Sequence, residues 1–320
     1  MRVHGSILLA AALGFTLLVG VASPASGSLS GPLLTIGDSW TYRTNTSIGG
    51  AFFLGGDVTV TTTGRGLQSV DGIMYDAVRF SLSGAGTANG TVATQFGPTR
   101  ASGNWVLSGN EVFESAGLKL VSSVLDLEAS GTLHTAPVAF PFQLSVQNTT
   151  TFRIVEDSWR FPFGIGNSSV VASRMNFSED SRFFYGLQTT PSHTQGSLWW
   201  NVTYALETQV AVDTPAGHFD SYRFREAAPD GTYSLLYYAP ATGNDARTEA
   251  YNGTAKVATS ELTSYRYQAL EPARFFGLTG TDWAITGIAA EAAGGGVLVF
   301  WLRIRRRPTP PDRRPSEPRN

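Results

Sequence analysis

The chain from Leu33 to about Tyr267 is dominated by short stretches in which apolar and polar residues alternate. These stretches are rich in valine, threonine and aromatic residues, and glycine, asparagine, aspartate and proline separate them. Alternation with a period of two is typical of strands that bury one face, and the separating residues favour turns. The pattern therefore predicts an all-β, antiparallel body, with strands at 57–62, 75–83, 118–125, 152–155 and 208–212.

A different pattern begins at Trp283. Almost every residue from Trp283 to Leu302 is apolar, and four arginines follow within 303–307. About 20 apolar residues are enough for a helix to cross a bilayer. Tryptophans suit the two headgroup layers, and clustered arginines mark the cytoplasmic side. We therefore predict one transmembrane helix at 283–302, with the body outside the cell and the tail, 303–320, in the cytoplasm.

The predicted helix carries one acidic residue, Glu291, near its centre. A charged side chain at that depth costs about 2.5 to 3.5 kcal/mol on insertion scales. Ala290 and Gly294 have the small-xxx-small spacing that lets two helices approach closely in lipid, as do Ala292 and Gly296. Two interpretations stay open: Glu291 helps to assemble a homodimer or a complex through this helix, or it is a tolerated carboxyl in a weak anchor.

Both ends of the chain agree with this topology. Residues 1–25 combine a basic start, an apolar run and small residues, which is the pattern of a secretory signal peptide. An uncleaved segment would instead remain as a second anchor. The tail 303–320 is rich in proline and arginine, so we expect it to be disordered beside anionic membrane lipid, with docking of a dedicated partner as the alternative.

A weak internal repeat divides the outer body. Residues 36–42 resemble 155–161, and residues 75–80 resemble 219–224, in the same order. We expect the aromatics of these motifs to face the core, with a ligand platform as the alternative. The repeat predicts a first β unit at 33–130, a connecting segment at 131–154 and a second β unit at 155–267, built as two related half-barrels or sandwiches.

Two turn motifs in the second half carry a resemblance. They read Thr-Pro-Ala-Gly-His-Phe-Asp from Thr214 and Tyr-Tyr-Ala-Pro-Ala-Thr-Gly from Tyr237. Proline followed by a glycine with positive φ allows the chain to reverse before the next strand. The motifs resemble those of secreted and periplasmic β domains, similar to the half-barrel carriers of lipoproteins and lipids. The resemblance implies a curved antiparallel sheet around an apolar cavity.

Glycosylation sequons are frequent in the predicted outer body. Seven of the eleven asparagines fit Asn-x-Ser/Thr, where chance in a chain so rich in serine and threonine would give roughly two. The excess favours a glycosylated outer surface, although a threonine-rich chain also makes sequons freely. The predicted sites are Asn45, Asn89, Asn148, Asn167, Asn176, Asn201 and Asn252.

Composition excludes several classes of function. The net charge is −2 and basic residues concentrate only in the tail, so we expect no nucleic acid partner. Cysteine is absent, which excludes disulfides and thiolate metal sites, and lysine occurs only as Lys119 and Lys256. The outer body must therefore hold together without disulfides.

Recognisable catalytic chemistry is absent from the sequence. His134, His193 and His218 do not fall in a zinc-binding motif, and the sequence contains no nucleophile elbow, no phosphate-binding loop and no other cofactor motif. Asp126 and Glu128 would share a strand face and could bind calcium, but we favour a solvated strand face as the explanation. We expect no cofactor. An enzyme is the third hypothesis, and a cluster of histidine and carboxylate side chains in a cleft would support it.

Adjacent aromatic residues give the one indication of binding. In a strand, neighbours point to opposite faces, so at most one residue of each pair reaches the core. The others need a partner sheet, a cavity or a glycan as cover. The first hypothesis is an anchored extracellular β protein that binds an apolar or extracellular ligand, and the alternative is a structural or adhesive coat protein. The candidate ligand-binding residues are Trp199, Trp200, Tyr237 and Tyr238.

Overall fold

The computed structural model describes residues 28–29, 33–48, 52–94, 97–115, 119–135, 138–159, 163–185 and 188–267. Every element in these ranges is a β-strand, and every described ladder is antiparallel, as the alternating pattern predicts. The strands are β1 (Ser28–Leu29), β2 (Ser39–Ile48), β3 (Phe52–Val70), β4 (Ile73–Thr94), β5 (Gly97–Glu114), β6 (Leu120–Thr135), β7 (Val138–Asp157), β8 (Phe163–Gly164), β9 (Ser168–Tyr185), β10 (Gln188–Thr214), β11 (Gly217–Ala227), β12 (Thr232–Ala239), β13 (Asn244–Asn252) and β14 (Ala255–Arg266).

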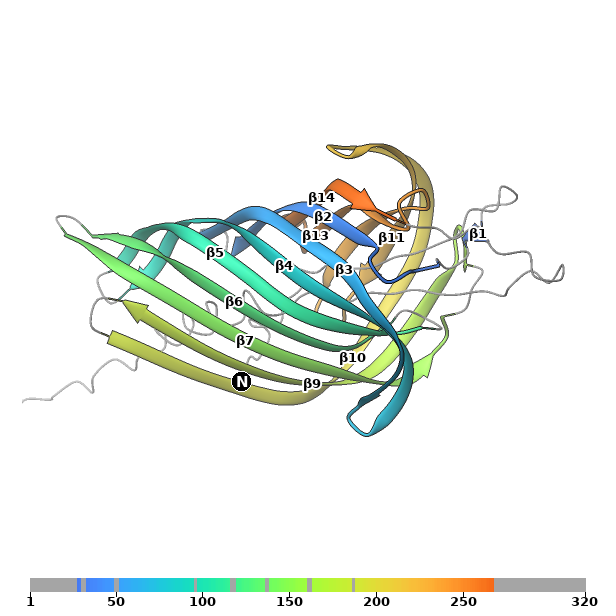
Figure 1. The fold of residues 1–320 in the computed structure, drawn as a ribbon, viewed down its shortest axis with the longest axis horizontal. Helices are drawn as coiled ribbons and strands as arrows, with labels where there is room; N and C mark the ends of the chain where they lie inside the picture. Colours follow the sequence, from blue (N-terminus) through green and yellow to red (C-terminus); the bar gives the residue numbers. More distant parts are fainter. Residues whose placement is uncertain are drawn as a thin grey trace, which may run out of the picture.

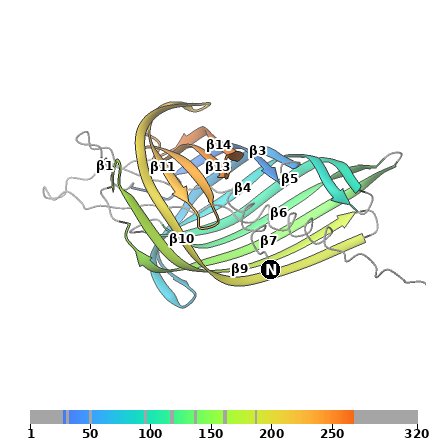
Figure 2. The same cartoon turned by 180° about the vertical axis from the view of Figure 1, so that it is seen from behind.

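Twelve of these strands close into one barrel in the order β10-β11-β12-β13-β14-β2-β3-β4-β5-β6-β7-β9. The short strands β1 and β8 form a separate two-stranded ladder. Long strands β3 to β7 and β9 make one broad curved wall, and the shorter β11 to β14 lie across the barrel from part of it (Figures 1 and 2). The strands of both expected β units thus belong to a single closed sheet.

The expected connecting segment at 131–154 is wrong. These residues complete β6 and form most of β7. In β7 the apolar Phe142, Leu144 and Val146 face inward, while Gln143 and Ser145 between them are exposed. The alternation was present in the sequence, but the nearby proline and amide residues obscured it.

Alternation also separates the inner face of the barrel from the outer one. Inward side chains from all twelve barrel strands contribute to one continuous hydrophobic cluster of buried residues. Serine, threonine, glutamine, arginine and acidic residues dominate the outer face. The free energy of burial thus comes from the inner face, at roughly 25 cal/mol for each Å² of apolar surface.

Two paired glycines lie where the backbones of β3 and β4 approach closely. Gly56 of β3 pairs with Gly86 of β4, and a Cβ built on Gly86 would lie 2.0 Å from the carbonyl oxygen of Gly55. Trp105, the next residue across the sheet, covers this point and donates its Nε1 hydrogen to the same carbonyl at 3.3 Å. Glycine is therefore required where the two backbones approach most closely.

Strand β10 pairs with two neighbours over different parts of its length. It pairs with β9 as far as Ala205 and with β11 from Thr203 onward, with a register shift between Leu206 and Thr208. In Figure 1 it follows β9 along the lower edge and then curves upward towards β11. A bulge of this kind increases the local twist and re-aims the strand.

Aromatic side chains pack where the strands converge. Trp159 stacks on Phe163 at 4.5 Å between ring centroids and meets Tyr204 edge-on at 5.1 Å. Trp40 is fully buried on the inner face of β2 and donates its Nε1 hydrogen to the carbonyl of Thr242 at 2.8 Å. Trp40 faces the core as the repeat motif predicts, whereas Trp159 is buried just beyond the end of β7.

The two predicted turns are confirmed. Pro215 lies in the turn between β10 and β11, where Gly217 has a φ of +140°. Pro240 lies in the turn after β12, where Gly243 has a φ of +65°.

The predicted signal peptide at 1–25, the transmembrane helix at 283–302 with Ala290, Glu291 and Gly294, and the tail at 303–320 lie outside the described residues. Within the described ranges, no helix is long and apolar enough to cross a membrane.

Candidate functional site

The adjacent aromatic pairs obey the rule that one member faces the core. Trp200 is 7% exposed and Tyr238 is fully buried, both within the hydrophobic cluster. Trp199 lies on the outer face with 56% of its surface exposed. Tyr237 is partly exposed, and its hydroxyl donates to Glu249 at 3.5 Å. The structure therefore does not bring these four residues together in one pocket, because the two buried ones face the interior and the other two face outward.

A groove of about 510 Å³ lies on the outer face of the broad wall, over β5, β6, β7, β9 and β10. Its floor follows two neighbouring cross-strand rows. One row runs Val106, Glu128, Ser145 and Arg182, and the other runs Asn104, Ser130, Gln143, Phe184 and Thr189.

Opposite charges flank the middle of this groove. Ser145 pairs with Glu128 on one side and with Arg182 on the other, so the two charged residues are about 10 Å apart across two strand spacings. The second row supplies the amides of Asn104 and Gln143, which both donate and accept hydrogen bonds. The partly exposed ring of Phe184 adds an apolar surface beside them. The groove therefore offers many hydrogen-bonding groups and one aromatic ring to a polar ligand.

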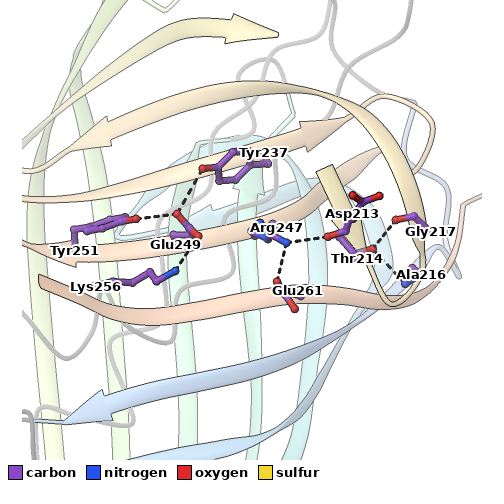
Figure 3. Close-up of polar contacts among 10 residues, drawn as sticks. All are labelled: Asp213, Thr214, Ala216, Gly217, Tyr237, Arg247, Glu249, Tyr251, Lys256 and Glu261. Carbon is purple, nitrogen blue, oxygen red and sulfur yellow. Dashed lines mark hydrogen bonds and ion pairs between the residues drawn. The ribbon is translucent and has the colours of Figure 1, made fainter. Parts of the chain in front are cut away.

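A second group of polar contacts lies on the outer face of β12 to β14 (Figure 3). The carboxylate of Glu249 accepts hydrogen bonds from Tyr251 at 2.8 Å, Lys256 at 3.1 Å and Tyr237 at 3.5 Å. Burial raises the pKa of Glu249, but the hydrogen bonds from Tyr251 and Lys256 outweigh it and lower the pKa overall. Burial and the bond to Glu249 raise the pKa of Tyr251 to about 12. All three donors are directed at Glu249, so this cluster has a structural role.

A neighbouring ion-pair group has the same character. Arg247 pairs with Glu261 at 2.9 Å and donates to the carbonyl of Asp213 at 2.8 Å, which connects β13 and β14 to the end of β10 (Figure 3). At the turn itself, the hydroxyl of Thr214 accepts from the N–H of Ala216 and donates to the carbonyl of Gly217. These contacts fix the turn that the sequence motif predicts.

No protein-family model, curated protein or solved structure matches this chain.

Two histidines of the described chain pair with carboxylates, and both pairs lie on the exposed surface. Nδ1 of His193 lies 2.9 Å from Asp180, and Nδ1 of His218 lies 2.7 Å from Asp213. The hydrogen bond to the carboxylate raises the pKa of each histidine. All four side chains are more than half exposed, so neither pair forms the cleft that would favour an enzyme.

The calcium alternative has little support from the geometry. Asp126 and Glu128 share the outer face of β6 as expected. Among the described residues, no group of three or more histidine or acidic side chains could hold a metal ion. His134 is also exposed on this strand, where Nε2 lies 2.9 Å from the hydroxyl of Ser102.

The predicted glycosylation sites divide into two classes. Asn148 is only 3% exposed, and its Oδ1 accepts a hydrogen bond from Thr150 at 2.9 Å on the inner face of β7. A transferase cannot reach a side chain inside the folded barrel. The hypothesis therefore narrows to the exposed sites Asn45, Asn89, Asn167, Asn176, Asn201 and Asn252.

The sequence patterns did not reveal two carboxyl groups that the structure buries, those of Glu111 and Asp245. Burial raises the pKa of Glu111, on the inner face of β5, to about 8, although a hydrogen bond from Ser123 opposes the shift. Burial also raises the pKa of Asp245 well above its usual value, and nearby Glu226 adds to the effect. Each would have been recognisable only from its place on an inward-facing strand position.

Proposed function

We propose that the protein is a membrane-anchored, extracellular β-barrel protein that binds a saccharide in the outer groove. The observation that carries the proposal is the groove itself, with two amides, two opposite charges, several hydroxyls and Phe184 arranged along two rows. Hydroxyl-rich ligands need donors and acceptors together, and the apolar face of a sugar ring can pack on an aromatic ring.

An apolar ligand inside the barrel has less support than a ligand in the groove. The interior candidates Trp200 and Tyr238 are packed against other buried side chains of one cluster. A carrier similar to the half-barrel lipid-binding domains would need these side chains around a cavity. We therefore place the ligand outside, in keeping with an extracellular ligand.

The proposal places one end of the barrel against the membrane. Strand β14 ends at Arg266, on the same side as the tip of the β3–β4 hairpin, the end of β7 and the β1–β8 ladder (Figures 1 and 2). The predicted helix at 283–302 follows β14 in the sequence. Exposed apolar side chains gather in these segments, which favours contact with a lipid surface. They are Leu67, Met74, Val155 and Ile165, and Ile36 is exposed in the stretch just before β2.

The saccharide hypothesis is tested with the full chain in lipid nanodiscs. We would measure binding to chito-oligosaccharides, manno-oligosaccharides and polygalacturonate by calorimetry. Gln143→Ala and Arg182→Gln each remove hydrogen bonds to the ligand, so each should weaken binding about tenfold. The matched control is Gln147→Ala, on the same strand and face but outside the groove. Absence of binding, or equal losses in Gln143→Ala and Gln147→Ala, would refute the proposal.

A structural or adhesive coat protein is the second candidate. The observation that favours it is Trp199, a large aromatic side chain 56% exposed on the outer face of β10. A coat protein would cover this ring with a neighbouring copy. A photoreactive residue at Trp199 in intact cells should then cross-link two copies of this chain, and cross-links to lipid or no cross-links would speak against a coat.

A further inference from the structure

Lys119 lies between two carboxylates at the junction of β5, β6 and β7. Its Nζ is 2.5 Å from Oδ2 of Asp157 and 2.9 Å from Oε2 of Glu114. The side chains are 8% exposed for Lys119, 22% for Glu114 and 20% for Asp157. An amine and a carboxyl are thus held in contact in a mostly buried place, with a second carboxylate beside the amine.

The backbone fixes all three groups. The N–H of Glu114 donates to the carbonyl of Lys119 at 2.9 Å across the β5–β6 turn. Oδ1 of Asp157 accepts the N–H of Trp159 at 2.9 Å, and Trp159 is itself buried and stacked on Phe163. The Asp157 carboxyl is therefore held by a backbone donor on one oxygen and faces Lys119 with the other.

We propose that Lys119 and Asp157 form an intramolecular isopeptide bond, with Glu114 as the proton shuttle. Oε2 of Glu114, 2.9 Å from Nζ, takes one proton from the Lys119 ammonium and passes it to Oδ2 of Asp157. Nζ then attacks Cγ of Asp157, and the Trp159 N–H stabilises the charge that develops on Oδ1. Glu114 takes a proton from the nitrogen and gives it to the departing hydroxyl. The products are one amide and one water, so the reaction needs no oxidant and no co-reactant.

A bond at this position would be a covalent cross-link between two neighbouring strands. The β6–β7 ladder runs from Thr135 and Val138 at the hairpin turn to Ser122 and Thr151 at its open end. Lys119 and Asp157 lie just beyond that open end. A bond there would prevent the two strands from separating, in a chain that has no cysteine for disulfides.

The other lysine provides an internal comparison. Nζ of Lys256 pairs with one carboxylate, Glu249, at 3.1 Å, and its side chain is 48% exposed. Among the ion pairs of the described residues, Lys256 has no second carboxylate beside it, and its side chain is far more exposed than that of Lys119. We therefore assign no isopeptide bond to Lys256.

The test is peptide mapping by mass spectrometry of the full chain purified from membranes and deglycosylated. Wild-type protein should yield one branched peptide that joins the segments around Lys119 and Asp157, one water lighter than their sum. Lys256→Arg should give the same branched peptide. Linear Lys119 and Asp157 peptides at full mass in the folded wild-type protein would overturn the proposal, because they would show an ordinary ion triad.

Three variants separate the roles. Lys119→Arg keeps the charge but cannot form the amide, so only linear peptides should appear. Asp157→Asn should still form the bond with loss of ammonia, which gives the same branched product from a different starting mass. Glu114→Gln should leave at least nine-tenths of the chain linear, with circular dichroism confirming the fold. Complete cross-linking in Glu114→Gln would refute the shuttle role.

Discussion

Glu111 makes the stability of the barrel depend on pH in a way that one substitution should remove. It is fully buried on the inner face of β5, and Phe80 and Ser123 are its partners on the flanking strands. Ser123 donates to Oε1 at 3.4 Å, whereas Oε2 is buried and has no hydrogen-bond partner. Burial raises the pKa of this carboxyl from 4.5 to about 8. The folded state therefore holds the group neutral at neutral pH.

The sign follows from proton linkage. Above pH 4.5 the unfolded chain loses the Glu111 proton, while the folded chain keeps it until about pH 8. Unfolding then releases a proton, so a rising pH favours unfolding. The slope is about 1.4 kcal/mol per pH unit, so between pH 5 and pH 8 this group should lower the free energy of unfolding by about 4 kcal/mol.

Urea unfolding of wild type and Glu111→Gln, followed by tryptophan fluorescence from pH 5 to pH 8, measures this effect. The amide is neutral throughout, so the variant should gain stability over the wild type as the pH rises. Ser123→Ala removes the hydroxyl that opposes the shift and should extend the slope to higher pH. Glu128→Gln, on the exposed outer face of β6, should leave the pH dependence unchanged. Parallel stability curves for wild type and Glu111→Gln would refute the reasoning.

Two further predictions concern the outer surface. Site-specific mass spectrometry of the protein from its own membrane should find glycans at exposed asparagines such as Asn89 and Asn201 but an unmodified Asn148, whereas a glycan on Asn148 in folded protein would contradict its burial. Because the chain lacks cysteine, Met74→Cys and Val138→Cys each create a unique labelling site, and a spin label at Met74 should contact lipid while one at Val138 stays in water. Equal water exposure of the two labels in an anchored protein would show that the β3–β4 tip does not face the bilayer, and release of the protein by carbonate would instead show that the anchor hypothesis is wrong.

The sequence predicted what local patterns encode. Alternation placed the strands at 75–83 and 208–212, which lie in β4 and β10. The adjacent-aromatic rule correctly placed only one tryptophan of Trp199 and Trp200 in the core. Closure of the barrel escaped prediction because it depends on the ladder between β14 and β2, which lie at opposite ends of the described chain. A local pattern of polar and apolar residues does not specify which strands become neighbours.

The candidate sites escaped prediction for a related reason. The groove draws its residues from five strands, and its serines, threonines and amides are the ordinary composition of an outer face. Only the sheet register aligns Glu128, Ser145 and Arg182 in one row. Lys119 was notable in the sequence as one of two lysines, but its carboxylate partners became visible only when the ends of β5 and β7 met at the start of β6.

The isopeptide bond also has a predictable effect on stability. It would close a loop of about 40 residues between Lys119 and Asp157, and the chain-entropy relation for cross-links of this length gives about 4 kcal/mol. Lys119→Arg keeps the positive charge beside both carboxylates but cannot form the amide, so its free energy of unfolding should fall by about 4 kcal/mol and its urea midpoint should fall accordingly. Lys256→Arg, which also exchanges one cation for another, should not lower it. Burial of Glu111 lowers the free energy of unfolding by a similar amount at pH 8. The isopeptide bond would offset that loss in a barrel without disulfides. Equal midpoints for wild type and Lys119→Arg, in protein whose peptide map shows the bond, would mean that the open end of the β6–β7 ladder is already constrained in the unfolded chain.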